Sequence, residues 1–325
     1  MQVLVTGSTG FIGVHLVTAI VARGWQVRCL VRATSQRQPL AAYDVEYVIG
    51  TLQDRAVLRQ AVQGIDMVFH LAGATRVYVA TDYDRINVGG TRQLLEACAD
   101  RPTPLRKFLY ISSIAAAGPS PTGRPLTEQD PPQPVGPYGR SKLRAEEAVL
   151  SYKATFPVMV LRPSAIYGPR DTDFLQLFQA MQYRILPHIG RQDLHVDLCF
   201  VGDLVHGILA AADHPAADGE VFFLGGSSHT WRELGGEIAR QMDVHPREIV
   251  FPRGFVLACA SLADLWARLR QQPSLLGRAN VLERLRPFWL CDSSKAQQML
   301  GYAPRTALAQ GIAETLLWYQ KAAWL

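Results

Sequence analysis

The first thirteen residues place the strongest constraint on the fold. They read MQVLVTGSTGFIG, and the glycines Gly7, Gly10 and Gly13 stand three residues apart between an apolar run and an amphipathic stretch. Gly7 suits a tight turn, Gly10 lets the backbone approach a pyrophosphate, and Gly13 allows close packing of the following helix. The free N–H groups at a helix N-terminus also attract phosphate. We therefore predict a strand, a turn and a helix that bind a dinucleotide.

Short apolar runs alternate with helical patterns along the first half of the chain. The runs are mostly apolar throughout, which is typical of strands buried on both faces of a parallel sheet. The predicted strands are Gln2–Thr6, Gln26–Val31, Val45–Ile49, Met67–His70, Phe108–Ile111 and Val158–Leu161. The predicted helices are Phe11–Arg23, Arg55–Gln63, Tyr83–Ala99 and Tyr138–Thr155. This alternation predicts an α/β fold with a Rossmann-type doubly wound parallel sheet.

The regular alternation lapses after Gly168-Pro169. We expect residues 1–169 to form the dinucleotide-binding Rossmann domain, with one further strand, Glu220–Leu224, returning to its sheet. Residues 170–325 are expected to form mainly a smaller C-terminal substrate-binding lobe.

One stretch of that lobe, Phe255–Ala267, is apolar nearly all round. Ser261 and Asp264 interrupt it, and it is shorter than the roughly 18 residues that indicate a membrane span. We predict a buried helix of the lobe. A helix that lies on a membrane surface is the alternative.

Composition excludes several classes of protein. The 325 residues are 48% hydrophobic and 19% charged, which is typical of a soluble globular chain. The net charge is +5, but the 33 basic residues are scattered, so we expect no nucleic-acid partner. The five cysteines lie far apart, so we predict neither a metal site nor a disulfide framework. With no signal peptide or transmembrane span in view, the expected location is the cytoplasm.

The residue that follows the second strand bears on the choice of dinucleotide. An acidic residue there would hydrogen-bond the ribose 2′-OH of NAD. This chain has Arg32 instead, with Ser35 and Arg37 nearby. An arginine suits a 2′-phosphate, so NADP(H) is favoured and NAD(H) remains an alternative. A solvated surface arginine is the other interpretation of Arg32.

Tyr138 and Lys142 stand four residues apart at the start of a predicted helix, so both side chains project from one face. The ordinary pKa of tyrosine is about 10. A nearby lysine ammonium and a nicotinamide cation would lower it, which would let the phenol exchange protons near neutrality. The pair follows Ser112 and Ser113, which come directly after the fifth predicted strand.

Several motifs now occur together in one order: T-G-x-x-G-F-I-G, H-L-A-G, the S-S pair, Y-G-R-S-K and L-R-P-S-x-x-Y-G-P. They cover residues 3–169, and D-S-S-K-A-x-x-x-L-G-Y-x-P begins at Asp292. Jointly they resemble the extended short-chain dehydrogenase/reductase superfamily, that is, the NAD-dependent epimerase/dehydratase family. The resemblance is greatest to its branch of dihydroflavonol reductases, 3β-hydroxysteroid dehydrogenases and hopanoid-associated enzymes.

The resemblance implies a role for each matching residue. Ser113 would polarise the reacting oxygen, and Tyr138 would act as general acid or base. Lys142 would hold the nicotinamide ribose and tune Tyr138. Asn87 would support the lysine through water, or else would bond backbone as an ordinary helix residue.

The resemblance also implies a set of cofactor contacts. They are Gly7, Thr9, Gly10, Phe11, Ile12, Gly13, Arg32, Thr51, Leu52, Leu71, Ala72, Gly73, Tyr138, Lys142, Pro163 and Ile166. Thr51 departs from the aspartate that is usual on the adenine side, which puts an adenine contact of that side chain in doubt. The expected substrate contacts are Thr75, Ser113 and Phe174.

Three reaction types share this framework, and the sequence discriminates between them. Family dehydratases typically carry a T-D-E triplet where this chain has Ser113-Ile114-Ala115, so dehydration is disfavoured. Sugar-nucleotide epimerases usually have an asparagine at the position of Ala165 and an arginine at that of Val196. Both positions are apolar here, which favours ketone and secondary alcohol chemistry on a small apolar substrate. A nucleotide-sugar epimerase is one alternative; a non-catalytic NADP(H)-binding regulator or assembly subunit is the other.

A homodimer is expected as well. The family often pairs through the helices that hold Asn87 and Tyr138. Those helices carry apolar residues beyond one face, namely Leu94, Leu95, Leu143 and Val149.

Overall fold

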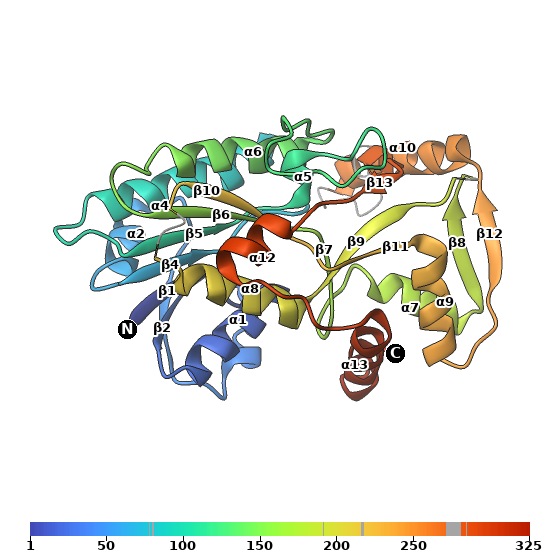
Figure 1. Cartoon of the computed structure of the whole chain (residues 1–325), viewed down its shortest axis with the longest axis horizontal. Helices are drawn as coiled ribbons and strands as arrows, with labels where there is room; N and C mark the ends of the chain where they lie inside the picture. Colours follow the sequence, from blue (N-terminus) through green and yellow to red (C-terminus); the bar gives the residue numbers. More distant parts are fainter. Residues whose placement is uncertain (78, 80, 191, 216–217, 271–280, 284) are drawn as a thin grey trace.

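A parallel β-sheet lies at the centre of the larger lobe of the molecule (Figure 1). The computed structural model describes residues 1–325 except 78, 80, 191, 216–217, 271–280 and 284. Within the described residues this sheet has seven strands in the order β10-β6-β5-β4-β1-β2-β3, and every neighbouring pair is parallel. The strands are β1 (Gln2–Thr6), β2 (Gln26–Val31), β3 (Val45–Ile49), β4 (Met67–His70), β5 (Lys107–Ile111), β6 (Val158–Pro163) and β10 (Glu220–Leu224). The predicted Rossmann-type sheet, with its returning strand, is confirmed.

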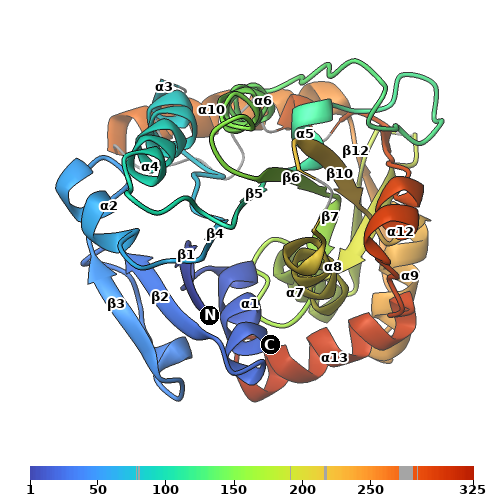
Figure 2. The same ribbon diagram turned by 60° about the vertical axis from the view of Figure 1, so that its left-hand side comes forward.

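Helices cover both faces of the sheet, as Figure 2 shows. One face packs against α1 (Phe11–Ala22) and α8 (Val201–Asp213), and the other against α2 (Arg55–Ala61), α4 (Gly90–Ala99) and α6 (Pro137–Leu150). Successive side chains of a strand point to opposite faces. Accordingly Val3 and Val5 belong to the core beneath α1 and α8, whereas Leu4 belongs to the core on the other side. The sheet is therefore buried on both faces.

The helix predicted over Tyr83–Ala99 is not a single α-helix. The segment consists of α3 (Thr81–Tyr83), a π-helix (Asp84–Gly89) and then α4. A π-helix within an α-helix shifts the side chains that follow it and is frequent at functional sites. Asn87 lies inside this π-helix. Periodicity in the sequence does not distinguish such a segment from an ordinary helix.

The rest of the chain builds a second lobe around smaller sheets. Strand β9 (His195–Phe200) pairs with β7 (Ala165–Tyr167), β11 (Ser227–Thr230) and β13 (Phe288–Trp289). Strand β8 (Ile185–Ile189) pairs in parallel with β12 (Arg247–Phe251). The helices of this lobe are α7 (Leu175–Gln182), α9 (Trp231–Gln241), α10 (Arg253–Arg270) and α13 (Leu308–Lys321). Short helical segments lie elsewhere at Gln38–Leu40 and at α5 (Ile114–Ala117).

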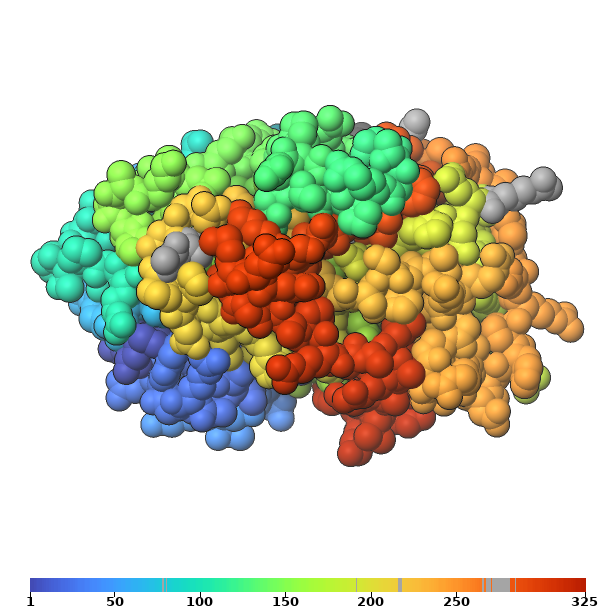
Figure 3. All heavy atoms as spheres, in the orientation of Figure 1, coloured from blue at the N-terminus to red at the C-terminus, as the bar shows by residue number. Residues whose placement is uncertain are grey.

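The C-terminal part of the chain returns to the larger sheet. Helix α12 (Ser294–Leu300) packs against β10 and α8, and it occupies the middle of the face seen in Figure 3. Tyr302 follows it, and its hydroxyl donates to the carbonyl of Gly225 at 2.7 Å. Ala296, Leu300 and Tyr302 belong to the same core as β1 and α1. Segments far apart in sequence thus complete the Rossmann core.

One prediction, that the helix over Phe255–Ala267 is buried, is wrong; the segment lies in α10. The segment was expected to be buried, but Phe255 is 57% exposed, Leu262 66% and Trp266 58%. Ala260, on the opposite side of the helix, is 1% exposed. Three large apolar side chains of the helix are therefore exposed rather than buried. No helix among the described residues is long and apolar enough to span a bilayer.

Candidate active site

The turn after β1 has no room for a side chain at two of its three glycines, Gly7 and Gly13. Gly7 has a φ of 72°, in the left-handed region that favours glycine, and a Cβ there would lie 2.8 Å from the backbone nitrogen of Ala72. A Cβ on Gly13 would overlap the carbonyl oxygen of Gly7. Gly10 is the N-cap of α1 and donates its N–H to the carbonyl of Gly7 at 3.1 Å. The turn therefore presents bare backbone at the N-terminus of α1, beside the partly buried Thr9, Phe11 and Ile12.

A buried hydrogen-bond chain ties this turn to the loop after β4. The N–H of Ala72 donates to Oγ1 of Thr6 at 3.1 Å, and that hydroxyl lies 2.7 Å from Nδ1 of His70. Burial lowers the pKa of His70 to about 3, so its ring is neutral. Because Thr6 accepts from Ala72, its hydroxyl proton points to His70. The other ring nitrogen then donates to Oγ1 of Thr91 at 2.9 Å, and Thr91 donates to the carbonyl of Asn87 at 2.6 Å.

Asn87 connects the same loop to α6. Its Oδ1 accepts from the N–H of Ala74 at 2.7 Å, and its Nδ2 donates to the carbonyl of Ala74 at 3.1 Å and to Oγ of Ser141 at 2.9 Å. Oδ1 also lies 3.1 Å from where a Cβ on Gly73 would be. Asn87 is 1% exposed. In this arrangement its amide fixes the loop against the residue that precedes Lys142.

Tyr138 lies in the first turn of α6 and faces Ser113. Ser113 lies two residues after the end of β5 and is the N-cap of α5, where its side chain accepts from the N–H of Ala115 at 3.1 Å. Burial raises the pKa of Tyr138 to about 12, and a hydrogen bond with Ser113 opposes this. The pKa of Tyr138 is therefore raised, whereas a lysine ammonium and a nicotinamide cation were expected to lower it. The reason is that the desolvation of the phenolate outweighs the other influences in the protein alone.

Lys142 lies one turn further along α6 and is 4% exposed. Its ammonium donates to the carbonyl of Ile111 at 2.7 Å and lies 4.3 Å from the ring centroid of Tyr110. Burial lowers its pKa to about 7, and Glu146 opposes this lowering. Lys142 can thus gain or lose a proton near neutral pH.

A buried ion pair underlies this part of α6. Glu146 accepts two hydrogen bonds from Nε of Arg162, at 3.0 and 3.2 Å, and one from Nη2 at 2.6 Å. The hydroxyl of Ser112 also donates to Glu146. Both charged side chains are at most 5% exposed. The pair fastens α6 to β6 and to the end of β5, and so fixes Tyr138 and Lys142 relative to Ser113.

Two further side chains near Tyr138 were not expected from the motifs. The ring of Tyr83 lies 5.9 Å from that of Tyr138, and its hydroxyl donates to the carbonyl of the exposed Thr75 at 3.0 Å. Glu283, from the second lobe, lies so close to Gly136 that a Cβ there would overlap its carboxylate. Burial raises the pKa of Tyr83 and of Tyr138, and Glu283 raises both further. No local motif could have indicated Glu283, because tertiary packing alone brings it to α6.

The residues predicted for the adenosine half lie around the carboxyl ends of β2, β3 and β4. Arg32 follows β2 directly, is exposed, and accepts a backbone hydrogen bond from Ser35 at 2.9 Å. Thr51 is exposed, and its hydroxyl accepts from the N–H of Gln53 at 3.3 Å. Leu52 is 7% exposed and packs against Gly90. Leu71 donates its N–H to the carbonyl of Thr6 at 3.2 Å.

The residues predicted for the nicotinamide half lie at the end of β6 and in β7. Pro163 ends β6, and Ile166 is half-buried in β7. Between them, the hydroxyl of Ser164 is buried and has no hydrogen-bond partner among the described residues. Phe174 lies at the start of α7, half-buried, with its ring 6.4 Å from that of Tyr167. It packs against the core of the second lobe.

The residues present fit a dinucleotide. Gly7 and Gly13 leave bare backbone at a helix N-terminus, which suits a pyrophosphate. The unpartnered hydroxyl of Ser164 offers a polar contact on the nicotinamide side. A ligand at the carboxyl ends of these strands would lie at the position where doubly wound sheets bind their ligands.

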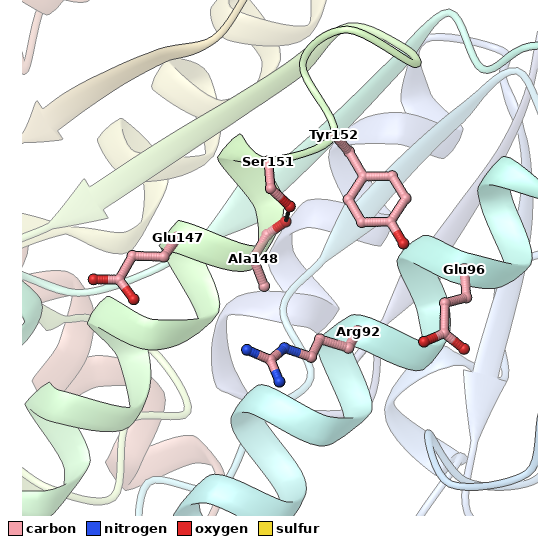
Figure 4. Close-up of a pocket in the computed structure, with 6 residues that line it drawn as sticks. All are labelled: Arg92, Glu96, Glu147, Ala148, Ser151 and Tyr152. Atoms are coloured by element: carbon pink, nitrogen blue, oxygen red, sulfur yellow. Dashed lines mark hydrogen bonds between the residues drawn. The ribbon is translucent and has the colours of Figure 1, made fainter.

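A separate hollow lies between α4 and α6 (Figure 4). Its lining residues are Arg92, Glu96, Glu147, Ala148, Ser151 and Tyr152. It is about 15 Å along α6 from Tyr138, at 1.5 Å per residue, and contains no catalytic residue. Of the four apolar residues expected to favour a dimer, Leu94, Leu95 and Val149 are fully buried within the chain's own core, whereas Leu143 is half-buried.

Comparisons with known proteins agree with this geometry. A family model described as the NAD dependent epimerase/dehydratase family matches residues 3–225. Ceramide reductase of Caulobacter vibrioides is 31% identical over 326 residues, which cover 99% of this chain and 96% of that protein. The 4-hydroxy-2-methyl-3-oxo-4-farnesyl-3,4-dihydroquinoline-1-oxide ketoreductase of Stigmatella aurantiaca is 32% identical over 332 residues, which cover 96% and 95%.

A solved structure is similar over the same length. MoeE5 in complex with UDP-glucuronic acid and NAD has a TM-score of 0.80 and 26% identity, and the match covers 99% of this chain and 100% of that one. These findings confirm the resemblance seen in the motifs. The chain belongs to the NAD dependent epimerase/dehydratase family and is an enzyme of the extended short-chain dehydrogenase/reductase superfamily that takes a nicotinamide cofactor.

Proposed function

We propose that this enzyme interconverts a ketone and a secondary alcohol on an apolar substrate, with NADP(H) as its cofactor and Tyr138 as the acid or base. The observation that carries the proposal is the grouping of Ser113, Tyr138 and Lys142 at the carboxyl ends of β5 and β6. Their hydrogen bonds and burial suit proton transfer to an oxygen. A bound nicotinamide would supply or accept the hydride.

Ser113, Tyr138 and Lys142 would each have a separate role in the transfer of one proton. Ser113 bonds Tyr138 and would orient the reacting oxygen toward it. In reduction Tyr138 gives its proton to the developing alkoxide, and in oxidation it removes the hydroxyl proton. A phenol whose pKa is raised to about 12 is fully protonated at neutral pH, so it is ready to act as the acid. Lys142, one turn further along the same helix, would hold the ribose.

Two observations support an apolar substrate. Ala165 and Val196 replace the polar residues that nucleotide-sugar epimerases usually have at these positions, and neither can bond a diphosphate. The relatives named a ceramide reductase and a farnesyl-dihydroquinoline ketoreductase act, by their names, on lipid-like molecules and in the reductive direction. We therefore propose reduction of a lipid-like ketone, and we place Thr75, Ser113 and Phe174 at the substrate.

Arg32 supports NADP(H) over NAD(H). It is exposed directly after β2, the strand next to the glycine turn, where its guanidinium can reach a 2′-phosphate. We expect Arg32→Asp to lower the preference for NADPH over NADH, measured as the ratio of the two kcat/KM values. Arg59→Asp, at an exposed position on α2, is the matched control and should leave the ratio unchanged. An unchanged ratio in both variants would show that Arg32 is only a surface residue.

Tyr138→Phe tests the mechanism. The variant keeps the ring that packs on Tyr83 but lacks the transferable proton. General acid catalysis typically contributes about 10²–10⁴ in rate, so we expect kcat to fall by that factor with an apolar ketone. NADPH affinity, measured by fluorescence titration, should stay nearly the same, because the lost group acts in the transition state.

Tyr83→Phe is the matched control, since it removes a neighbouring phenol that bonds only backbone in the described contacts. A wild-type rate in Tyr138→Phe would refute the mechanism. Saturable NADPH binding without turnover on any ketone or alcohol would favour a non-catalytic regulator or assembly subunit. Turnover of a nucleotide sugar would favour the epimerase. A homodimer and a cytoplasmic location stay predictions.

A further inference from the structure

Helix α10 exposes large apolar side chains to solvent, whereas a surface helix of a globular protein usually turns its apolar face to the core. Phe255, Cys259, Leu262 and Trp266 recur at steps of four, three and four residues, which places them on one face of a helix. Each of the four is exposed. Ala260, which projects to the other side, is buried. The large apolar side chains therefore form a solvent-facing stripe.

We propose that this stripe binds the surface of a lipid bilayer. Helices that lie in the interface of a membrane combine an apolar face with cationic side chains at its margins. Arg253 and Arg270 are exposed at the two ends of α10, and the guanidinium of Arg270 lies 4.4 Å from the ring centroid of Trp266. Tryptophan and arginine are both suited to the headgroup region. The net charge of +5 adds attraction to anionic lipids.

The size of the stripe favours a bilayer over a second copy of the chain. An aromatic side chain covers about 150–250 Å². Multiplying such areas by the exposed fractions of Phe255, Leu262 and Trp266 gives roughly 400 Å² of apolar surface that the stripe exposes to solvent. A stable protein–protein interface buries about 800 Å² on each partner. An interfacial helix needs only a few inserted side chains, so the stripe is sufficient for a membrane surface and small for a dimer.

Helix α10 lies on the side of the molecule that also carries the active-site helix α6. Figures 1 and 2 both show α10 on the same side of the molecule as α6, which holds Tyr138. Glu283, shortly after α10 in sequence, lies against Gly136 at the start of α6. A bilayer at the stripe would therefore lie on the side of the molecule that carries α6, and we propose that an apolar ketone reaches Tyr138 from that side. This delivery of substrate rests on the proposed function, whereas bilayer binding itself does not.

Cys259 provides a direct probe of the stripe. It is the exposed member of the five free cysteines, since Cys29, Cys98, Cys199 and Cys291 are buried. A nitrobenzoxadiazole label at Cys259 should shift its emission to the blue when vesicles of equimolar phosphatidylcholine and phosphatidylglycerol are added. The control label is placed on α13 in a Cys259→Ser/Leu317→Cys variant, because Leu317 is 51% exposed away from the stripe. That label should not shift.

Vesicle sedimentation then tests the side chains. We expect Leu262→Ser/Trp266→Ser to weaken vesicle affinity about tenfold or more, because apolar area inserted at the interface sets the strength of binding. The matched control Ile49→Ser/Leu317→Ser changes two equally exposed apolar residues elsewhere and should bind as the wild type does. Thermal melting of both variants verifies that they are folded.

Three results would overturn the proposal. They are no vesicle binding by the wild type, equal binding by the stripe variant, or a wild-type dimer in sedimentation velocity that the stripe substitutions convert to a monomer. The last would assign the stripe to a second copy. Failure of the proposed function is distinguishable, because vesicle binding is measured without cofactor or substrate. Turnover of a short, water-soluble ketone reports on the chemistry alone and should be unchanged in the stripe variant.

Discussion

Glu146→Leu leaves a buried arginine without its partner and should be among the most destabilising single changes in the active-site region. In the native protein Glu146 accepts three hydrogen bonds from Arg162 and one from Ser112, and both charged side chains are almost fully buried. Removing one partner of a buried ion pair costs about 3–5 kcal/mol. Folded proteins are stable by about 5–15 kcal/mol, so this loss is a large fraction of the total.

The assay is urea unfolding followed by circular dichroism. With a slope of about 3 kcal/mol per molar urea, the upper end of the usual range, the midpoint should fall by about 1–2 M. The double variant Glu146→Leu/Arg162→Met removes both charges and replaces them with apolar side chains. It should recover much of the loss, since an apolar pair of similar volume often equals a buried ion pair.

Glu96→Leu is the matched surface control. Glu96 pairs with Arg55 at 3.1 Å, with both side chains well exposed, and such pairs contribute about 0–1 kcal/mol. The reasoning would be refuted if Glu146→Leu behaved like this control. It would equally be refuted if the double variant were less stable than the single one, because the cost would then not come from an unpaired charge on Arg162.

The remaining predictions concern Lys142 and the glycine turn. The pKa of Lys142 falls to about 7 on folding from an ordinary value of 10.5, so between these values the unfolded chain binds more protons and stability rises with pH. The variant Lys142→Met lacks this rise. The free energy of unfolding of the variant minus that of the wild type should therefore be greatest near pH 7 and decline toward pH 10. Both values come from urea unfolding without cofactor. Gly13→Ala should abolish NADPH binding in a fluorescence titration, because its Cβ would overlap the carbonyl of Gly7. Gly236→Ala, where a Cβ meets nothing within 4 Å in α9, should instead stabilise the protein by about 1 kcal/mol.

Either of two results would contradict these expectations. A constant difference between Lys142→Met and the wild type across this pH range would show that the lysine is not desolvated as the structure indicates. NADPH affinity in Gly13→Ala equal to that of Gly236→Ala would show that the turn tolerates a side chain.

The sequence by itself determined those features of the structure that depend only on residues close together in the chain. The spacing of Gly7, Gly10 and Gly13 specifies a turn that requires glycine at its first and last positions, and the apolar runs specify strands buried on both faces. Tyr138 and Lys142 share a helix face because of their spacing alone. For this reason the parallel sheet could be predicted from local pattern, as could the family, from the motifs.

Only the tertiary structure decided which distant segments meet. It brought α12 and Tyr302 to the Rossmann core, and it placed Glu283 against Gly136. It also set the direction of the Tyr138 pKa, which depends on burial, and the exposure of α10, which was predicted to be buried. An apolar helix is buried only if something packs against it, and the periodicity of a segment carries no information about what lies beside it.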